Sequence, residues 1–173
     1  IKMDALKNSS VKIHDLKDVS NVSKTYFLDI RIEKGETELS NNFYWLSTKK
    51  DVLDYDKEVS GWNYHTPSKE YADFSQLDDM EKINVDYTVK VLKEDNYTIF
   101  DVELINQNKQ IAFFINLSIM NKESGQTILP IIWDDNYISL TPMERRRISA
   151  KIKNTVLQNY EPQFELSGHN LKN

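Results

Sequence analysis

The sequence predicts an all-β protein, an antiparallel immunoglobulin-like β-sandwich preceded by part of a second sandwich. Three observations lead to this fold class. Apolar and polar residues alternate along several short segments, which is the period of half-buried strands. The connections between these segments are short and rich in Asn, Asp, Lys and Gly, residues that favour turns. Strands spaced this closely are typical of a sandwich rather than of alternating strands and helices.

The clearest strands lie in the second half of the chain. In residues 97–106, Thr98, Phe100, Val102 and Leu104 form one apolar face. In residues 110–120, the predicted apolar face is Ile111, Phe113, Ile115, Leu117 and Ile119. The full set of strands predicted here covers residues 84–93, 97–106, 110–120, 148–153 and 162–168.

The first third of the chain shows the same alternation. Its predicted strands are residues 9–16, 24–33 and 41–48, with residues 33–40 as a hairpin loop that turns at Gly35. Three strands would leave an apolar sheet face in water, which monomeric proteins rarely tolerate. Because the chain also opens on Ile1-Lys2-Met3, we expect this region to begin inside a larger protein and to be capable of self-association.

Residues 49–83 are polar and irregular, and they separate the two β regions. Tyr71, Phe74 and Leu77 fall three apart and predict a short helical turn after Ser68. We expect a connector that packs, because its aromatic side chains need burial. The predicted organisation is therefore a partial sandwich (1–48), a packed connector with a short helix (49–83) and an immunoglobulin-like sandwich (84–173).

Composition excludes several function classes. The formal net charge of −5 argues against nucleic acid or an anionic membrane as partner, because both need a clustered basic surface. The chain has no cysteine, so disulfides, thiolate metal sites and a cysteine nucleophile are excluded. With only four glycines, it has no phosphate-cradling loop, and no apolar run is long enough to span a membrane.

No catalytic, metal or cofactor site is predicted. The three histidines, His14, His65 and His169, lack a neighbouring motif that would place a nucleophile beside them. Ordinary surface or packing histidines are the favoured interpretation.

The stretch LPIIWDDNYISLTPME (129–144) resembles a site because it clusters aromatic and polar residues. Its oxygens suit calcium, yet adjacent loop residues point apart and the spacing of an EF-hand is missing. We favour a β-hairpin in which Ile131 and Ile132 end one strand and Tyr137, Ile138 and Leu140 begin the next. Candidate contacts with a sugar or a domain interface are Trp62, Tyr64, Trp133, Asp134, Asp135, Asn136 and Tyr137.

Several short stretches of the sequence resemble a known family. NNFYWLST (41–48), DVLDY (51–55), YHTPSKEYADFSQL (64–77), IAFFINLSI (111–119) and LPIIWDDNYISLTPME (129–144) are similar, in that order, to the last two β-sandwich domains of glycoside hydrolase family 2. The closest subgroup is the exo-β-D-glucosaminidases, with the β-mannosidases near by. The resemblance implies a retaining parent hydrolase whose two catalytic glutamates sit on a (β/α)₈ barrel.

The barrel and both glutamates are absent from this chain, so no catalytic residue is transferred to it. The resemblance also implies export of the parent to the periplasm or the cell exterior. Two departures stand out. The family tends to have glycine where this chain has Met143, and a Gly-Trp-Asn ending where this chain has Gly168-His169-Asn170.

We therefore expect a non-catalytic C-terminal region of an exo-β-glucosaminidase-like family 2 glycosidase that braces the absent barrel and is no enzyme by itself. Its partners would be the catalytic and other domains of the parent. The alternatives are an autonomous carbohydrate-binding module that binds polysaccharide through its aromatics, and a protein–protein adhesion sandwich.

Overall fold

The computed structural model describes residues 6–13, 21–35, 37–57 and 65–172. Its contacts divide the chain into two compact units, Ile1–Asp79 and Met80–Asn173, which are described separately. Among the described residues, no helix is long and apolar enough to cross a membrane.

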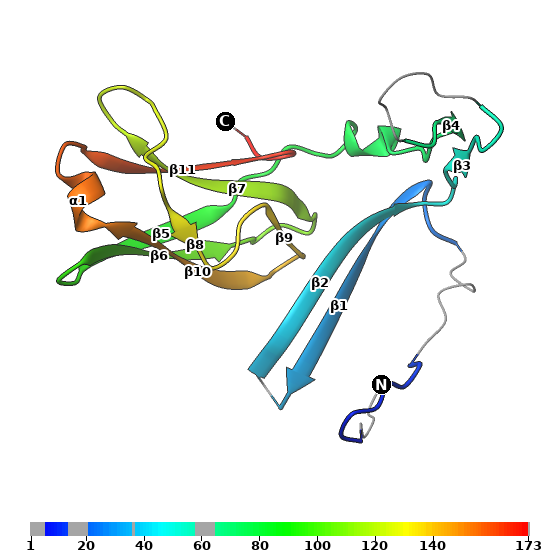
Figure 1. Ribbon diagram of the computed structural model, residues 1–173, viewed down its shortest axis with the longest axis horizontal. Coiled ribbons are helices and arrows are strands. Elements are labelled where there is room, and N and C mark those ends of the chain that lie inside the picture. The colour runs from blue at the N-terminus through cyan, green and yellow to red at the C-terminus, as the bar shows by residue number, and fades with distance from the viewer. Residues whose placement is uncertain (1–5, 14–20, 36, 58–64, 173) are drawn as a thin grey trace. The chain divides into compact units, whose positions relative to one another are not determined.

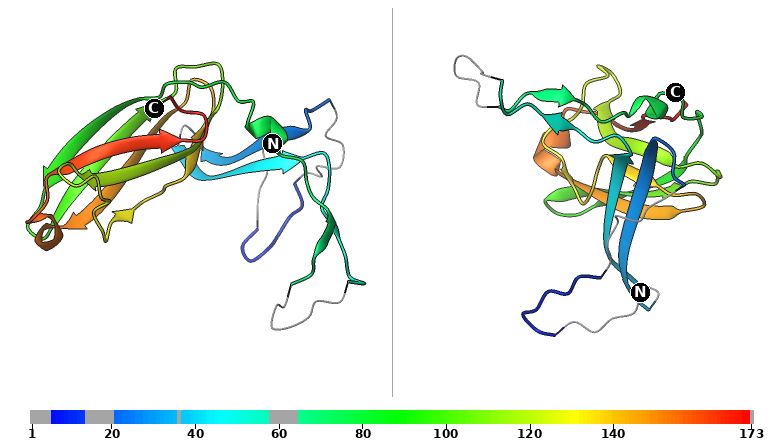
Figure 2. Two further views of the ribbon diagram at one scale, coloured as in Figure 1. Left: turned by 90° about the horizontal axis from the view of Figure 1, so that it is seen from above. Right: turned by 90° about the vertical axis from the view of Figure 1, so that its right-hand side faces the viewer.

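The second unit is a sandwich of two antiparallel sheets (Figures 1 and 2). One sheet has the order β5-β6-β10-β8, with β5 at Asp86–Lys93, β6 at Tyr97–Ile105, β8 at Ile132–Trp133 and β10 at Arg145–Lys153. The other has the order β11-β7-β9, with β7 at Ala112–Asn121, β9 at Ile138–Leu140 and β11 at Pro162–Gly168. A single helical turn, α1 at Asn154–Leu157, follows β10. The predicted all-β antiparallel sandwich is confirmed.

The core of this unit lies between the two sheets. On β6 the predicted apolar face is buried, with Phe100, Val102 and Leu104 each at most 2% exposed. On β7 the prediction is wrong at one end, because the register with β9 shifts between Ala112 and Ile115. This bulge brings Ala112, rather than Phe113, onto the core face of Ile115. Phe113 is buried outside this core cluster, and its ring lies edge-on to that of His169.

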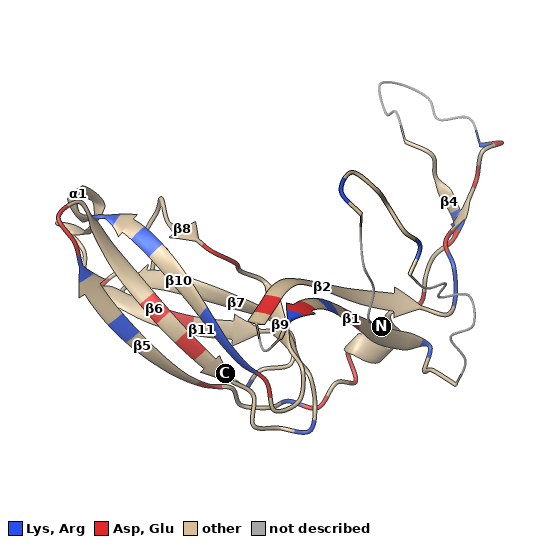
Figure 3. Cartoon of the chain, turned by 90° about the horizontal axis from the view of Figure 1, so that it is seen from below, with Lys and Arg blue, Asp and Glu red and all other residues tan. Residues whose placement is uncertain are grey.

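The outer face of the larger sheet is charged, with acidic residues of β6 between basic residues of β5 and β10 (Figure 3). Asp101 accepts hydrogen bonds from Nε and Nη2 of Arg147, and Glu103 pairs with Arg145. The hydrogen bond from Arg147 lowers the pKa of Asp101 below its usual range. Its stabilisation is present above the unfolded pKa, near 4, and is lost as pH falls through the lowered value. Exposed ion pairs of this kind contribute little to stability, because water and salt screen their charges.

The first unit contains a long antiparallel hairpin, β1 (Thr25–Lys34) and β2 (Thr37–Ser47). These strands confirm two of the three predicted in this region. The predicted loop 33–40 is wrong in extent, because the strands run on to a tight turn at Gly35, whose φ of 63° suits glycine. The predicted strand 9–16 is wrong where it is described, since residues 9–13 are not in a strand. Residues 14–16 lie outside the described residues.

The segment after the hairpin packs mainly through polar contacts. β3 (Val52–Leu53) pairs with β4 (Ser68–Glu70), so the predicted helical turn begins only at the 3₁₀-helix η2 (Ser75–Leu77). Thr25 at the start of β1 donates its backbone N–H to Gln76 and its hydroxyl to the carbonyl of Asp73. The expected burial of aromatics is wrong for Tyr71 and Phe74, which are 68% and 36% exposed.

Candidate functional site

The segment 129–144 is not the β-hairpin that the sequence predicts. β8 pairs with β10 in the larger sheet, where Trp133 lies opposite Ala150. β9 pairs with β7 in the smaller sheet, where Ile138 lies opposite Ile115. The strands on either side of the polar cluster thus belong to different sheets, and the cluster is a crossover between them (Figure 1). The local pattern of apolar and polar residues is the same for a hairpin and for a crossover. The two differ only in the partner strands, which are distant in sequence.

Asp134 fixes the first end of this crossover to β10. Its Oδ2 accepts hydrogen bonds from the Ser149 hydroxyl at 2.6 Å and the Ser149 backbone N–H at 3.1 Å. Its own backbone N–H donates to the Ser149 carbonyl at 2.9 Å. The Asp134 carboxylate is therefore occupied by its hydrogen bonds with Ser149 on β10.

Asn136 fixes the other end to β7. Its Oδ1 accepts the backbone N–H of Leu117 at 2.8 Å, and its Nδ2 donates to the Leu117 carbonyl at 2.9 Å. If the register that places Ile115 opposite Ile138 is continued by two residues, Leu117 falls opposite Asn136 itself, just outside β9. The side-chain amide thus takes the place of a backbone pair in the ladder. Its oxygen also accepts the N–H of Tyr137 at 2.8 Å.

The two aromatic candidates that the structure describes, Trp133 and Tyr137, have separate contacts. Trp133 is half-buried and packs against both halves of the core. Tyr137 is 58% exposed, and its ring lies 5.3 Å from that of Phe114, tilted by 43°. Trp133 and Tyr137 thus lie in two separate environments within this unit, and their predicted role at a domain interface stays a prediction. Trp62 and Tyr64 lie outside the described residues.

Asp135 and the two histidines that the structure describes have ordinary surface or packing contacts. Asp135 is exposed, and its Oδ1 accepts the backbone N–H of Asn136 at 2.8 Å. His169 packs against Phe113, His65 is exposed, and His14 lies outside the described residues. In the part of the chain that the structure describes, no three His, Cys, Asp or Glu side chains gather as a metal site would need.

Two surface hollows lie on the second unit, one at a hairpin turn and one on a sheet face. One lies over the β5–β6 turn and is lined by the consecutive residues 94–97. The other, about 100 Å³, is lined by Thr88, Lys90, Asp101, Glu103 and Arg147 on the charged outer face. Ligand pockets in proteins are roughly 300–1,000 Å³. The second hollow is too small for a sugar chain, and the first draws on a single hairpin turn.

The role of Asn136 leads to a stability prediction. We expect Asn136→Ala to destabilise the chain by about 1–3 kcal/mol, because it leaves the buried N–H and C=O of Leu117 without partners. Asp135→Ala is the matched control and should cost well under half as much, since it removes one exposed contact. Urea unfolding of both variants measures the difference. Equal effects would contradict the bridging role of Asn136.

A comparison with protein families identifies the fold more closely. The family model of the exo-β-D-glucosaminidase Ig-fold domain matches residues 63–171, which include the whole crossover and both sheets. The chain belongs to this family.

Its relatives in the family are much longer enzymes. An exo-β-D-glucosaminidase of Arthroderma benhamiae is 37% identical over 99% of this chain and 18% of its own length. One of Amycolatopsis orientalis is 33% identical over 88% of this chain and 15% of its own length. The crystal structure of the Amycolatopsis orientalis exo-chitosanase CsxA superposes with a TM-score of 0.80 at 32% identity, covering 89% of this chain and 18% of that one. The chain therefore spans less than a fifth of these relatives.

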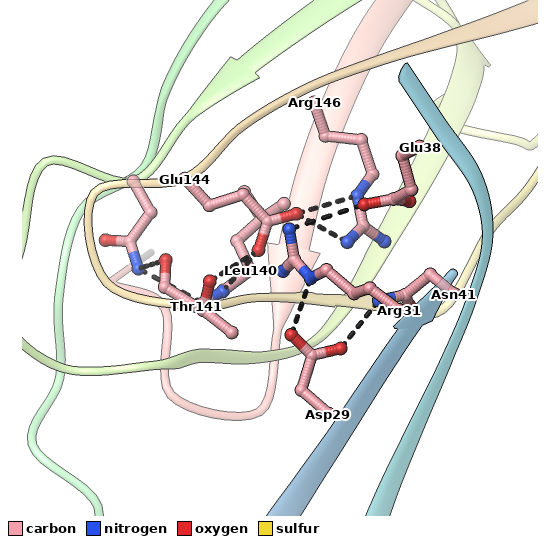
Figure 4. Close-up of polar contacts among 9 residues, drawn as sticks. Asp29, Arg31, Glu38, Asn41, Leu140, Thr141, Glu144 and Arg146 are labelled. Carbon is pink, nitrogen blue, oxygen red and sulfur yellow. Dashed lines mark hydrogen bonds and ion pairs between the residues drawn. The ribbon is translucent and has the colours of Figure 1, made fainter. Parts of the chain in front are cut away.

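The turn before β10 contains a residue in left-handed geometry. Glu144 accepts the backbone N–H and the hydroxyl of Thr141 at 2.8 and 2.7 Å, and pairs with Arg146 (Figure 4). Met143, in the middle of this turn, has a φ of 61°. The turn thus keeps the left-handed geometry that suits glycine, although this chain carries methionine there.

Met143→Gly is therefore expected to stabilise the chain by about 0.5–1 kcal/mol, because a side chain with φ near 60° costs energy that glycine avoids. Met143 is 71% exposed, so its removal loses little packing. Met143→Ala is the control, since alanine keeps the strained Cβ and should bring no comparable gain. Thermal unfolding of both variants tests this, and a gain from alanine as large as from glycine would rule out strain as the cause.

Two buried asparagines are structural features of the fold that sequence reasoning missed. Asn106 and Asn170 are at most 1% exposed, and each binds backbone groups from several segments. An isolated asparagine in a turn-rich sequence gives no signal of burial. The one available hint was the resemblance at Gly168-His169-Asn170, whose asparagine the family ending shares.

Proposed function

We propose that this chain supplies the C-terminal β-sandwich region of a retaining exo-β-D-glucosaminidase and braces its catalytic domain, without contributing catalytic groups. Support comes from the match itself. The relatives named exo-β-D-glucosaminidase share nearly the whole of this chain, but more than four fifths of their length lies outside it. That remainder leaves ample room for a catalytic barrel. A β-mannosidase parent is the less favoured form of the same proposal.

The observation that carries the proposal is how polar groups are used. Among the described residues, every buried side-chain nitrogen and oxygen has a hydrogen-bond partner within the chain. The cluster that most resembles a site uses Asp134 and Asn136 to join sheets. Fully satisfied buried polar networks rigidify a fold. Such rigidity suits a domain that braces its neighbours.

A carbohydrate-binding module is not favoured by the aromatic geometry. Stacking on sugar faces needs exposed, flat aromatic surface. Trp133 packs into the core, and Tyr137 is tilted against Phe114. No exposed pair among the candidate residues that the structure describes presents such a surface.

The direct test is an assay of the purified chain with p-nitrophenyl β-D-glucosaminide and with chitosan oligosaccharides. We expect no release of p-nitrophenol and no saturable binding heat, with the intact parent enzyme as the positive control. Hydrolysis by the chain would overturn the proposal. Saturable binding that is lost in Tyr137→Ala would replace it with the carbohydrate-binding alternative.

The resemblance also supports export of the parent to the periplasm or the cell exterior, which we propose on that basis. Glucosaminidase activity in the culture medium or a periplasmic fraction of the source cells is the expected result. Activity confined to the cytoplasmic fraction would contradict it.

A further inference from the structure

The turn between β5 and β6 contains one of the Asn-x-Ser/Thr triplets of the chain, which begin at Asn8, Asn21, Asn96 and Asn116. In exported proteins such a triplet is an acceptor for N-linked glycans and marks a surface loop. Bacterial transferases of this class also need an acidic residue two positions before the asparagine. Of the four triplets, only the one at Asn96 has it, as Glu94. This triplet therefore suits both a eukaryotic and a bacterial exporting cell.

The structure also separates the two triplets of the second unit. Asn96 is exposed and lies in the turn between β5 and β6, outside both strands. Asn116 is half-buried within β7, opposite Ser167 of β11, and its Nδ2 donates to Ser118 at 3.2 Å. A sugar chain has space at the turn and little space within a paired strand. Asn96 is therefore the better acceptor position of the two.

The backbone of this turn is held in place by Asn154 at the start of α1. The Nδ2 of Asn154 donates to the carbonyls of Glu94 at 2.8 Å and Asp95 at 3.2 Å. Its backbone N–H donates to the carbonyl of Asn96 at 3.0 Å. Its Oδ1 accepts the hydroxyl of Thr98, the third residue of the triplet, at 2.8 Å. The turn is thus fixed through its backbone and Thr98, while the Asn96 side chain remains exposed.

The position of Thr98 determines when a glycan can be added. A transferase must contact the hydroxyl of the third residue, because a triplet without Ser or Thr is no acceptor. Thr98 is 4% exposed, and its hydroxyl is already bonded to Asn154. The folded turn therefore exposes the acceptor asparagine but buries the group by which the triplet is recognised. Transfer must precede the pairing of β5 with β6.

Resting on the proposed export of the parent, we propose that Asn96 carries an N-linked oligosaccharide that is added before this hairpin folds. The donor class is an oligosaccharide on a lipid diphosphate. The Asn96 Nδ2 forms a bond to the anomeric carbon of the first sugar and loses one proton. The bond between that carbon and the diphosphate oxygen breaks, and the lipid diphosphate leaves. The completed fold accommodates the glycan because Asn96 lies exposed at a turn.

The test is peptide mass spectrometry of the parent protein exported by its source cells. We expect most copies of the peptide spanning Asn96 to carry the added mass of a sugar chain and to release sugar ions on fragmentation. Asn96→Gln should abolish this added mass. Asn159→Gln is the matched control, because Asn159 is exposed and begins no triplet, and it should leave the glycan in place. An exported protein whose Asn96 is unmodified would overturn the inference.

The order of glycan transfer and folding has a test of its own. A purified transferase supplied with a lipid-diphosphate oligosaccharide should modify a peptide of residues 91–101 at least about tenfold faster than the folded chain, which must first open locally. Equal rates would contradict transfer before folding. A parent found only in the cytoplasm would contradict both the proposed export and the glycan. An exported, active parent with an unmodified Asn96 would contradict the glycan alone, so the two failures are distinguishable.

Discussion

Asn170→Asp is expected to destabilise the second unit by about 3–5 kcal/mol, one of the two largest effects of a single conservative change that the structure points to. Asn170 is 1% exposed, and its Oδ1 accepts the backbone N–H of Phe113 at 2.8 Å. Its Nδ2 donates to the carbonyls of Ile111 at 2.9 Å and Glu81 at 3.1 Å. An aspartate there would place a buried carboxylate oxygen against two carbonyl oxygens, with no proton between them.

The damage should extend to both ends of the sandwich. The backbone N–H of Ile83 donates to the Asn170 carbonyl, and that of Lys172 donates to the Ile83 carbonyl. Asn170 therefore joins the start of the unit, the end of the unit and the beginning of β7. Urea unfolding measures the loss, with Asn84→Asp, at an exposed position, as the control. A loss for Asn170→Asp no larger than for the control would contradict this role.

Asn106→Asp is the second large effect, also about 3–5 kcal/mol. Asn106 is fully buried, and its Nδ2 donates to the carbonyls of Gln110, Leu140 and Thr141 at 2.8, 3.2 and 3.0 Å. Its Oδ1 accepts the backbone N–H of Asn108 at 3.0 Å. This side chain therefore holds the β6–β7 loop against the segment between β9 and β10.

The pH dependence of that variant identifies the cause. Burial against carbonyls should raise the pKa of the new carboxyl above its unfolded value near 4. A raised pKa means that the penalty is present at neutral pH and shrinks as pH falls through the folded pKa, because the protonated carboxyl can donate one hydrogen bond. Unfolding at pH 7 and pH 5 measures this, with Asn159→Asp, at an exposed loop position, as the control. A penalty that is identical at both pH values would rule out the buried charge as its source.

The sequence predicts the strands of this protein better than their partners. β6 and β10 alternate strictly, so the buried faces of Phe100, Val102 and Ile148 follow from periodicity. The bulge in β7 does not follow from periodicity. Phe113 and Phe114 are both apolar, so the pattern does not show which of them turns away from the core face. The crossover at 134–137 was missed for a related reason, since turn residues between two apolar runs predict a hairpin whether or not the runs pair.

At the candidate site, too, the sequence predicts the kind of residue but not its partners in the fold. Residue types identify Asp134 and Asn136 as turn formers that bind backbone, and the structure shows both doing so. Residue types do not show that Asp134 binds the backbone of one sheet and Asn136 the backbone of the other. The buried roles of Asn106 and Asn170 depend on segments far apart in sequence, so local pattern carried no sign of them.

The proposed role of residues 129–144 is to brace the fold and not to act on a substrate. It is tested most directly by Asn136→Ala in the intact parent enzyme, with kcat/KM for a β-D-glucosaminide and the thermal unfolding midpoint measured together. The structural role of Asn136 predicts a lower midpoint, with kcat/KM of the folded enzyme unchanged within about twofold. A fall in kcat/KM of about tenfold or more with an unchanged midpoint would contradict it and place this segment in the substrate site.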